Sequence, residues 1–334
     1  MFAEVDRLKG EYTIEVWNKR VRYALKIRRN ITVITGDSGT GKTTLVKMID
    51  AYDNNGVSSG VHLKCNVRCT YLHGRNWRDD LDKINNSIVF IDEQSSFIIK
   101  KEFAVAIQGT DNYYVLITRY NLEALPYSVH EIYGLRAVRN SGLHNSLLQT
   151  YNEQYELYGN HVTQSGVEPD CIITEDSNSG YQFFSNLGSR QIKKCISACG
   201  KTNIKNMIDT NLGGKVLIVA DGAAFGCEMR DTILKIKEHP NYYLWLPESF
   251  EWVLLKSNIL RFNVALLNEP YNYIESSEYF SWERYFTDLL IKVCEKTPGK
   301  IQYTKSKLPG IFLSNHAVTK VFNTFPAIKI QKEA

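Results

Sequence analysis

A glycine-rich segment constrains this chain more than any other part of it. Residues 31–50 read ITVITGDSGTGKTTLVKMID: an apolar β-branched run, a turn with three glycines, then apolar residues at helical spacing. Glycines let consecutive backbone N–H groups point at phosphate oxygens, and the N-terminus of the following helix adds partial positive charge. A strand, a G-x-x-x-x-G-K-T loop and a helix form the P-loop pattern, which predicts binding of a nucleoside triphosphate.

The predicted phosphate-binding residues are contiguous, namely Gly36, Asp37, Ser38, Gly39, Thr40, Gly41, Lys42, Thr43 and Thr44. Lys42 is expected to reach the β- and γ-phosphates, and the Thr43 hydroxyl is expected to bind Mg²⁺. ATP and Mg²⁺ are therefore the predicted cofactors.

A second apolar run ends in two acids. Residues 87–91 are followed by Asp92 and Glu93, the pattern of a buried parallel strand that delivers carboxylates to one edge of a sheet. Asp92 lies 49 positions after Thr43 (92 − 43). In P-loop enzymes the first acid of such a pair holds the Mg²⁺ shell and the second activates the attacking water. We assign Asp92 to Mg²⁺ and Glu93 to general base.

A third apolar run, residues 113–117, ends in Thr118 and Arg119. A parallel sheet would place this pair beside the γ-phosphate. Thr118 could then orient the water, and Arg119 could sense or neutralise the phosphate as a catalytic residue. The alternative for Arg119 is a surface salt bridge at the end of a strand.

Other segments complete the predicted first domain, residues 1–152. Residues 11–28 alternate in the manner of a β-hairpin, residues 61–72 are typical of one strand, residues 79–84 of a short helix, and residues 131–135 of a further strand. Pro126 is expected to close a helix, and residues 137–151 to continue as strand and hairpin. The polar stretch 152–168 is the expected domain boundary.

Six basic residues precede the glycine-rich loop, either as a solvated hairpin or as a phosphate-backbone contact: Lys19, Arg20, Arg22, Lys26, Arg28 and Arg29.

Length and composition narrow the class of protein. A chain of 334 residues with 43% hydrophobic residues is expected to form two globular domains. No apolar run is long enough to cross a bilayer, and the N-terminus lacks a signal-peptide pattern, so no membrane partner is expected. Seven scattered cysteines indicate a reducing, cytoplasmic environment. The pairs Cys65/Cys69 and Cys195/Cys199 are interpreted as structural thiols.

The second predicted domain, residues 168–334, starts a new alternation of strands and helices, which favours a mostly parallel sheet. Strands are expected near residues 171–174, 191–198, 215–220 and 241–246, and acids follow three of them. An amphipathic helix follows in a helical C-terminal tail that begins at residue 279. Lys300, Lys305 and Lys307 surround Tyr303, a weak indication of nucleic-acid contact. The predicted fold class is α/β, a P-loop sheet with an N-terminal hairpin followed by a second α/β domain.

The glycine-rich loop, the I-D-E strand and the L-I-T-R strand resemble additional-strand P-loop ATPases, a class that includes the AAA, STAND and ABC branches. The I-T-R end is most similar to the sensor strand of the AAA and STAND branches. No L-S-G-G-Q signature is present, and about 49 residues separate the two acid- and phosphate-binding elements, which leaves no room for the helical insert of an ABC-type ATPase. The resemblance implies ATP hydrolysis, and a homo-oligomer or a partner protein that completes the site.

Residues 170–255 resemble a Toprim domain, the metal-dependent module of topoisomerases, primases and overcoming-lysogenisation-defect nucleases. The resemblance implies that Glu175 is the catalytic acid/base and a metal ligand, that residues 200–203 (GKTN) match the G-K-x-N turn, and that Asp221 is the first metal aspartate. Ala223 stands where the family has its second metal aspartate. A further oxygen ligand is left open among Asp176, Glu228 and Glu248.

The predicted function is an Mg²⁺-dependent ATPase that regulates a Toprim-like, metal-dependent nuclease module, with nucleic acid as candidate partner. The resemblance implies antiviral (phage) defence as the context. The alternative is a nucleotide-driven switch whose Toprim-like domain binds a partner and cleaves nothing. A phosphotransferase, an unrelated ligand-binding domain, and strand-end acids that are ordinary surface residues also remain open.

Overall fold

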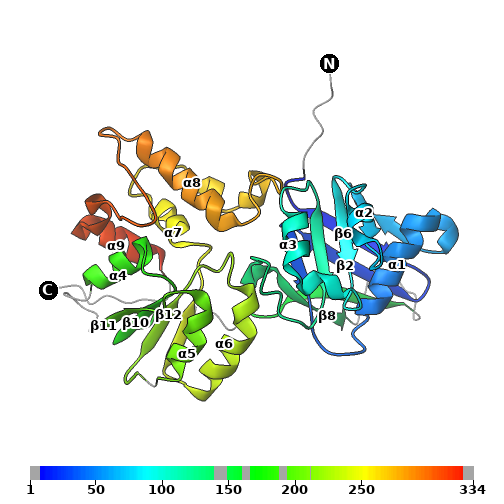
Figure 1. Ribbon diagram of the computed structural model, residues 1–334, viewed down its shortest axis with the longest axis horizontal. Helices are drawn as coiled ribbons and strands as arrows, with labels where there is room; N and C mark the ends of the chain where they lie inside the picture. The colour runs from blue at the N-terminus through cyan, green and yellow to red at the C-terminus, as the bar shows by residue number, and fades with distance from the viewer. Residues whose placement is uncertain (1–7, 139–148, 160–165, 188–193, 211, 326–334) are drawn as a thin grey trace. The chain divides into compact units, whose positions relative to one another are not determined.

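The computed structural model describes residues 8–138, 149–159, 166–187, 194–210 and 212–325. Its described part is an α/β structure with two sheets, divided into two compact units (Figure 1). The first unit comprises residues 1–157 together with 270–280, and the second comprises 158–269 and 281–334. Residues 270–280 join the first unit through hydrogen bonds from Gly10 N to Tyr271 O (2.7 Å) and from Asn30 Nδ2 to Phe280 O (2.7 Å).

The first unit is built on a mixed nine-stranded sheet with the order β4-β1-β2-β9-β8-β3-β7-β6-β5. The strands are β1 (Tyr12–Trp17), β2 (Val21–Ile27), β3 (Ile31–Ile34), β4 (His62–Lys64), β5 (Arg68–Tyr71), β6 (Ser87–Ile91), β7 (Tyr113–Ile117), β8 (Ile132–Val138) and β9 (Thr150–Glu156). The helices are α1 (Lys42–Asn55), α2 (Trp77–Leu81) and α3 (Lys101–Ile107). The predicted hairpin, the strands that precede the loop and the two polar pairs, and the helix after the loop are confirmed.

Strands β8, β3, β7, β6 and β5 run parallel to one another, with β7 between β3 and β6. Their register is level, because Ile34 pairs with Ile117 and Ile91 pairs with Leu116. All five residues of β6 and of β7 are buried, which explains their uninterrupted apolar sequences. The glycine-rich loop and the two polar pairs therefore leave the sheet at the same edge, on three adjacent strands.

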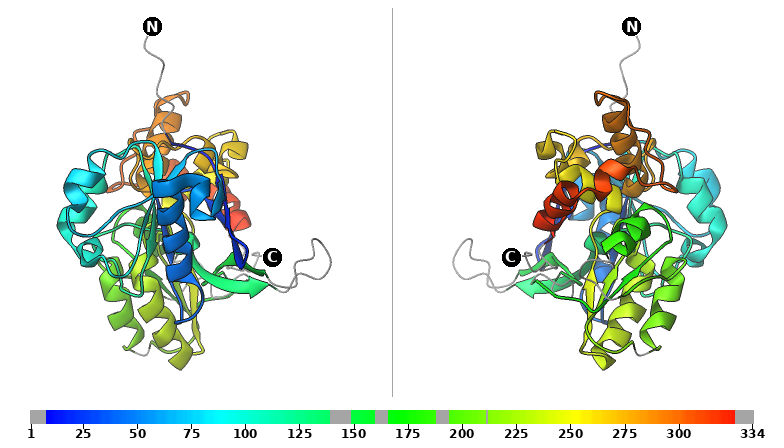
Figure 2. Two further views of the ribbon diagram at one scale, coloured as in Figure 1. Left: turned by 90° about the vertical axis from the view of Figure 1, so that its right-hand side faces the viewer. Right: turned by 90° about the vertical axis from the view of Figure 1, so that its left-hand side faces the viewer.

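The large sheet curls around α1. Strands β4 and β5 form its two edges, yet only residues 65–67 connect them, a link that spans at most about 14 Å. Eight strand spacings of about 4.8 Å would separate the edges of a flat sheet by about 38 Å. Helix α1 contacts β1, β4, β5 and β6 and lies against the strands in the left view of Figure 2. Its buried side chains, which include Leu45 and Ile49, fill the core inside the curl.

Several local predictions are wrong. Residues 61–72 form two strands at opposite edges of the sheet instead of one strand, because the chain bends at 65–67. The segment before Pro126 is a series of turns without a helix, whereas α3 had no predicted counterpart. Residues 152–156 are part of strand β9, so the polar composition there marks a partly buried strand that pairs with β8 and not a linker. The rest of the predicted hairpin, 139–148, lies outside the described residues.

The basic run before the loop is largely neutralised within the first unit. Arg28 and Arg29 form ion pairs with the fully buried Glu131, at 3.0 Å and 3.2 Å. Arg22 pairs with Glu15, and Lys26 pairs with Glu11 at 3.1 Å. Four of the six cations thus have acidic partners, which favours the hairpin interpretation over a phosphate-backbone contact.

The second unit contains a four-stranded parallel sheet with the order β11-β10-β12-β13. Its strands are β10 (Cys171–Thr174), β11 (Lys194–Ser197), β12 (Val216–Val219) and β13 (Tyr242–Trp245). Its helices are α4 (Ser179–Leu187), α5 (Ile204–Ile208), α6 (Gly226–Glu238), α7 (Phe250–Lys256), α8 (Trp282–Glu295) and α9 (Asn315–Thr324). The predicted parallel sheet and the amphipathic helix α8 are confirmed, and residues 188–193 of the expected second strand lie outside the described residues.

The strand order of the second unit contains a switch point. From β10 the chain crosses to β11 on one side, and then returns past β10 to β12 and β13 on the other. Right-handed crossovers place α4 on one face of the sheet and α5 with α6 on the other, as Figure 1 shows. Open parallel sheets bind ligands where the strand order reverses, outside the carboxyl ends of the strands. Here that position lies just beyond β10 and β12.

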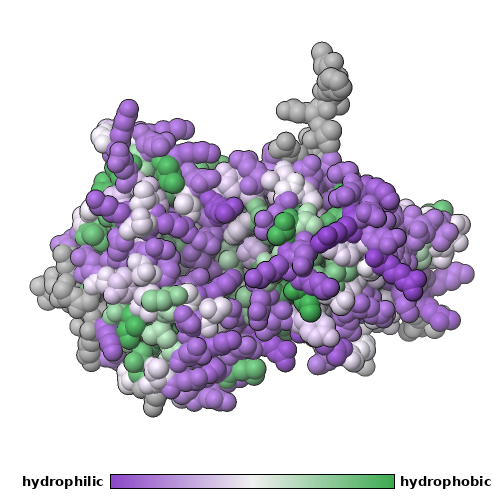
Figure 3. Space-filling model, in the orientation of Figure 1, coloured by the Kyte–Doolittle hydropathy of each residue, from purple (hydrophilic) through white to green (hydrophobic). Residues whose placement is uncertain are grey.

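Hydrophilic side chains cover most of the face shown in Figure 3, and apolar ones are scattered in small groups. Among the described residues, no helix has the length and apolar character needed to cross a membrane.

We predict that Glu131→Gln destabilises the first unit by about 3–5 kcal/mol, because it leaves the buried Arg29 without a compensating charge. Urea unfolding followed by tryptophan fluorescence measures the change. The matched control is Glu153→Gln, which breaks the 2.7 Å pair with the exposed Arg136 on the same sheet and is expected to cost less than about 1 kcal/mol. Equal effects of the two substitutions would contradict the prediction.

Candidate active sites

The glycine-rich loop owes its shape to its glycines and to one tyrosine. Gly36, Gly39 and Gly41 all have positive φ values, 117°, 84° and 87°, which favour glycine over other residues. Gly41 is restricted twice, because a Cβ atom there would lie 2.6 Å from the hydroxyl of Tyr23. The same hydroxyl donates to Gly41 O (2.9 Å), so strand β2 supports the loop from outside the motif.

Lys42 closes the loop from within. Its Nζ donates to the carbonyl oxygens of Gly36 (2.9 Å) and Asp37 (2.6 Å) and to Thr40 Oγ1 (2.9 Å). Its side chain is only 6% exposed, and burial, followed by the charge of Arg119, lowers the pKa of Lys42. The ammonium group is therefore held among three oxygens of the loop.

Arg119 joins the loop to the acid that follows β6. Its Nη2 donates to Ser38 Oγ (2.7 Å), and its Nε lies 3.6 Å from Glu93 Oε2. The side chains of Arg119 and Glu93 are both partly exposed, at 47% and 41%, so both are accessible to a ligand. The structure thus brings four of the predicted residues together: Ser38, Lys42, Glu93 and Arg119. The salt bridge considered as the alternative role of Arg119 is present, and its partner is Glu93, the predicted general base.

Asp92 lies one residue nearer to the sheet and is buried. Its Oδ1 accepts a hydrogen bond from Gln94 N (3.1 Å), and its carboxylate also accepts one from Tyr71 at the end of β5. Burial first, and then the charge of Asp92, raises the pKa of Tyr71 to about 12, so this tyrosine remains a donor at neutral pH. Thr43 and Thr44 are exposed in the first turn of α1, and Thr118 is buried beside Arg119.

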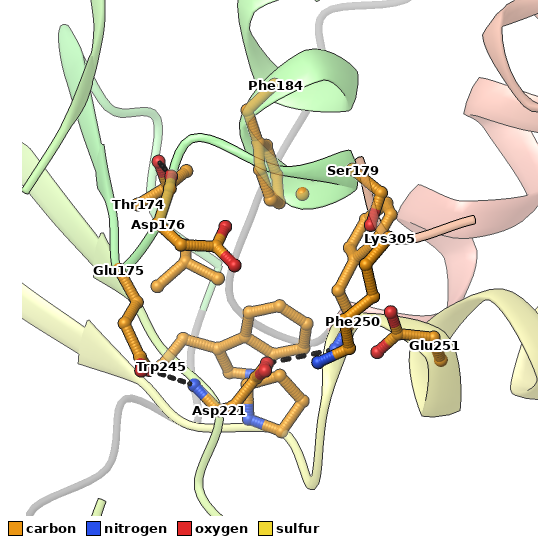
Figure 4. A pocket seen from close by; sticks show the side chains of 13 residues that line it. Thr174, Glu175, Asp176, Ser179, Phe184, Asp221, Trp245, Phe250, Glu251 and Lys305 are labelled. Carbon is orange, nitrogen blue, oxygen red and sulfur yellow. Dashed lines mark hydrogen bonds between the residues drawn. The ribbon is translucent and has the colours of Figure 1, made fainter. Parts of the chain in front are cut away.

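The second unit contains a pocket beyond β10 and β12, where the strand order reverses (Figure 4). Glu175 and Asp221, two of the site residues predicted from the sequence, both line it. Asp221 N donates to Glu175 Oε2 (3.0 Å), and Asp221 Oδ1 accepts from Phe250 N (3.0 Å), the first amide of α7. The pocket has a volume of about 30 Å³, enough for two or so water molecules or a small ion but too small for a nucleotide.

Several residues of this pocket were not predicted from the sequence. Glu251 lines it from α7 and is 1% exposed. Its Oε1 accepts from Tyr303 Oη (2.7 Å), and its Oε2 has no hydrogen-bond partner among the described residues. Tyr303 Oη also lies 2.9 Å from Ser179 Oγ. Lys305 lines the pocket and forms an ion pair with Glu283 of α8. Tyr303 is buried, so it is unsuited to stacking on a nucleic-acid base.

Carboxylates dominate the electrostatics of the pocket. Burial, and then the charges of Glu283, Glu175 and Glu251, raises the pKa of Asp221 well above its usual range, and Lys305 opposes this. Burial raises the pKa of Glu175 to about 7. For Lys305, burial lowers the pKa, but the surrounding carboxylates outweigh it and raise the pKa, so the ammonium stays charged.

The sequence left three candidates for a further metal ligand, and only one of them lines the pocket. Asp176 lines the pocket, but its carboxylate already accepts from Asn178 N (3.1 Å) and Asn178 Nδ2 (2.6 Å). Glu228 and Glu248 do not line the pocket, and Ala223 is buried. Within the described residues, no three histidine, cysteine, aspartate or glutamate side chains are grouped in a way that could hold a metal ion.

No protein-family model matches the chain, and the curated proteins contain no significant match to it. The geometry of the two sites is therefore the basis for inferring function.

We predict that folding stability falls as pH rises from about 4.5 to about 7, and that Glu175 is one cause. The folded-state pKa of about 7 lies above the unfolded value of 4.5. In this range the folded state holds a proton on Glu175 that the unfolded state has released, so each rise in pH favours unfolding. Urea unfolding at pH 5.0 to 7.5 should show a smaller decline for Glu175→Gln than for the wild type. Parallel declines would contradict the assignment.

Proposed function

We propose that the chain binds ATP with Mg²⁺ and hydrolyses it at the site on the first unit. One observation carries this proposal: the side chains that follow three adjacent parallel strands converge, with Lys42 inside the glycine-rich loop and Arg119 between Ser38 and Glu93. Phosphoryl transfer depends on positioning and charge stabilisation, and this group supplies two cations, an acid and a loop of N–H donors.

The oxygen donors near the loop suit Mg²⁺. Thr43 offers an exposed hydroxyl at the start of α1, and Asp92 offers a buried carboxylate that Tyr71 and Gln94 orient. Hydroxyl and carboxylate oxygens are the ligands that Mg²⁺ takes alongside phosphate and water. When bound, Mg²⁺ would neutralise charge on the β- and γ-phosphates.

The remaining roles belong to the chain's own residues. When ATP binds, Lys42 exchanges the loop carbonyl oxygens for phosphate oxygens. Burial removes water from the ammonium group and lowers its pKa, and a poorly hydrated ammonium gains more from contact with phosphate. Glu93 accepts the proton of the attacking water once Arg119 leaves it. Arg119 is held to Glu93 at 3.6 Å before the reaction, and a γ-phosphate competes for the same guanidinium group.

We predict that Glu93→Gln lowers kcat for ATP hydrolysis by about 10²–10⁴-fold and leaves KM nearly unchanged, because the amide keeps the shape but cannot accept the proton. A coupled phosphate-release assay with Mg²⁺ measures both constants. Glu123→Gln, at an exposed acid beyond Arg119, is the matched control and is expected to behave as the wild type. Hydrolysis by Glu93→Gln at the wild-type rate would overturn the role of Glu93.

For the second unit we favour a Toprim-like module that binds a partner without cleaving nucleic acid. The residues present do not fit the metal centre of a Toprim nuclease: Ala223 replaces one ligand, and Asp221 caps α7 through Phe250 N. A half-buried cation, Lys305, already balances the carboxylates. The competing function, metal-dependent cleavage regulated by the ATPase, rests on Glu175 and Asp221 alone.

Removing the charge of Lys305 should allow a metal ion to bind in the pocket and stabilise the fold. We predict that millimolar Mn²⁺ leaves the thermal unfolding midpoint of the wild type unchanged but raises that of Lys305→Met, because the variant exposes unbalanced carboxylates to the cation. Lys305→Arg keeps the charge and is expected to behave as the wild type.

Two results would contradict the non-cleaving module. One is a wild-type midpoint that rises with Mn²⁺ and no longer rises in Asp221→Asn. The other is cleavage of DNA or RNA by the wild type with ATP and Mn²⁺ that Glu175→Gln abolishes.

A further inference from the structure

The pocket of the second unit holds more acids than its own cation can pair with. Its lining contains four carboxyl groups, those of Glu175, Asp176, Asp221 and Glu251. Lys305 is the basic side chain among the lining residues, and it also forms an ion pair with Glu283, an acid outside the lining. The pocket therefore offers unbalanced negative charge to a ligand.

Three of these acids use their oxygens in the same way. Protein groups fix one oxygen of each: Asp221 N donates to Glu175 Oε2 (3.0 Å), Phe250 N to Asp221 Oδ1 (3.0 Å), and Tyr303 Oη to Glu251 Oε1 (2.7 Å). Within the described part of the chain, the second oxygen of each acid accepts no hydrogen bond. The carboxyl groups are therefore held in place by the protein while one oxygen of each is left for a ligand.

Glu251 gives the strongest indication that a ligand binds here. Its side chain is 1% exposed, and its Oε2 is buried without a hydrogen-bond partner among the described residues. In Figure 4 its carboxylate points from α7 toward Lys305 at the side of the pocket. Buried polar atoms in folded proteins are almost always hydrogen-bonded, because water cannot solvate them. A positively charged hydrogen-bond donor in the pocket would satisfy this oxygen.

The rest of the lining suits an organic cation better than a metal ion. The rings of Phe184, Trp245 and Phe250 line the same pocket, and the ring centroids of Phe184 and Phe250 lie 6.2 Å apart (Figure 4). Aromatic rings attract cations and also pack against the carbon atoms of an organic cation. A metal ion needs several oxygens that converge on one point. Within the described residues, no three acidic, histidine or cysteine side chains are grouped to supply them.

The size of the pocket restricts the part of the ligand that can enter. Its volume of about 30 Å³ has room for about two non-hydrogen atoms. The nitrogen of a primary amine and the carbon bonded to it fill such a space, whereas a quaternary ammonium group, with four carbons around its nitrogen, is too large. A primary ammonium group also brings three N–H donors, as the lysine side chain does.

We propose that this pocket binds the terminal CH₂–NH₃⁺ group of a primary ammonium ligand, with Glu251 Oε2 as the principal acceptor. The inference rests on the proposed role of the second unit as a module that binds a partner without cleaving nucleic acid. The head group is the shared chemistry, because a free diamine and the lysine side chain of a partner protein both carry it.

Thermal unfolding of the full-length chain with methylammonium chloride tests the proposal. Tetramethylammonium chloride at the same concentration is the matched control, because it has the same charge but is too large and has no N–H donor. We expect methylammonium at about ten times its Kd to raise the unfolding midpoint by about 2–5 °C, and tetramethylammonium to leave the midpoint unchanged. Equal shifts with the two salts, or no shift with methylammonium, would overturn the proposal.

One variant tests the principal acceptor. Glu251→Gln keeps an acceptor for Tyr303 Oη but places an NH₂ group where Oε2 stood, so the methylammonium shift should be lost. Glu228→Gln is the matched control, because Glu228 is another buried acid of the second unit but does not line the pocket. A full shift in folded Glu251→Gln would overturn the proposal. The comparison of the two salts on the wild type decides the matter if this variant fails to fold.

Two further ligands separate the possible sources of the head group. Putrescine represents a free diamine, and Nα-acetyl-lysine amide represents the lysine side chain of a protein; the larger shift at equal concentration identifies the source, and no shift with either would overturn the proposal. A failure of all the amines leaves the non-cleaving module in place. That module is contradicted separately, by a response to Mn²⁺ that is lost in Asp221→Asn.

Discussion

The position of β7 between β3 and β6 is the constraint on which the first site depends. Two strand spacings of about 4.8 Å separate the strand of the loop from the strand of the acids, and the middle strand delivers Arg119 between them. A guanidinium group has donors on several sides, so Arg119 reaches Ser38 at one side and Glu93 at the other. Lys42 lies within the loop, so Arg119 is the cation that connects the loop to Glu93.

The curl of the sheet supports this arrangement from behind. It brings β2 against the loop, where the Tyr23 hydroxyl donates to Gly41 O. On the other side, β5 pairs directly with β6, and Tyr71 of β5 donates to Asp92. Both tyrosines act through their hydroxyl groups, Tyr23 on the loop and Tyr71 on the acid. The link at 65–67 closes the curl next to β5, the strand that ends in Tyr71.

Local patterns in the sequence predicted what depends on local chemistry. Composition and periodicity predict the loop, its helix, the strands that precede Asp92 and Arg119, and the parallel sheet of the second unit, and the structure contains them. Contacts between distant segments could not be predicted in this way. Lys305 lines the pocket from a segment far along the chain, where it pairs with Glu283. The sequence around Tyr303 is typical of an exposed aromatic residue among lysines, but the fold buries this side chain against Glu251. The prediction of a single strand over residues 61–72 was wrong for a similar reason, because tertiary packing decides where the strand is interrupted.

Binding of ATP at Lys42 is the central claim, and isothermal titration calorimetry with a non-hydrolysable ATP analogue and Mg²⁺ tests it most directly. We expect one analogue bound per wild-type chain and no measurable binding to Lys42→Ala, because that variant lacks the ammonium group inside the loop. Absence of binding to the wild type, or equal binding to folded Lys42→Ala, would contradict the account.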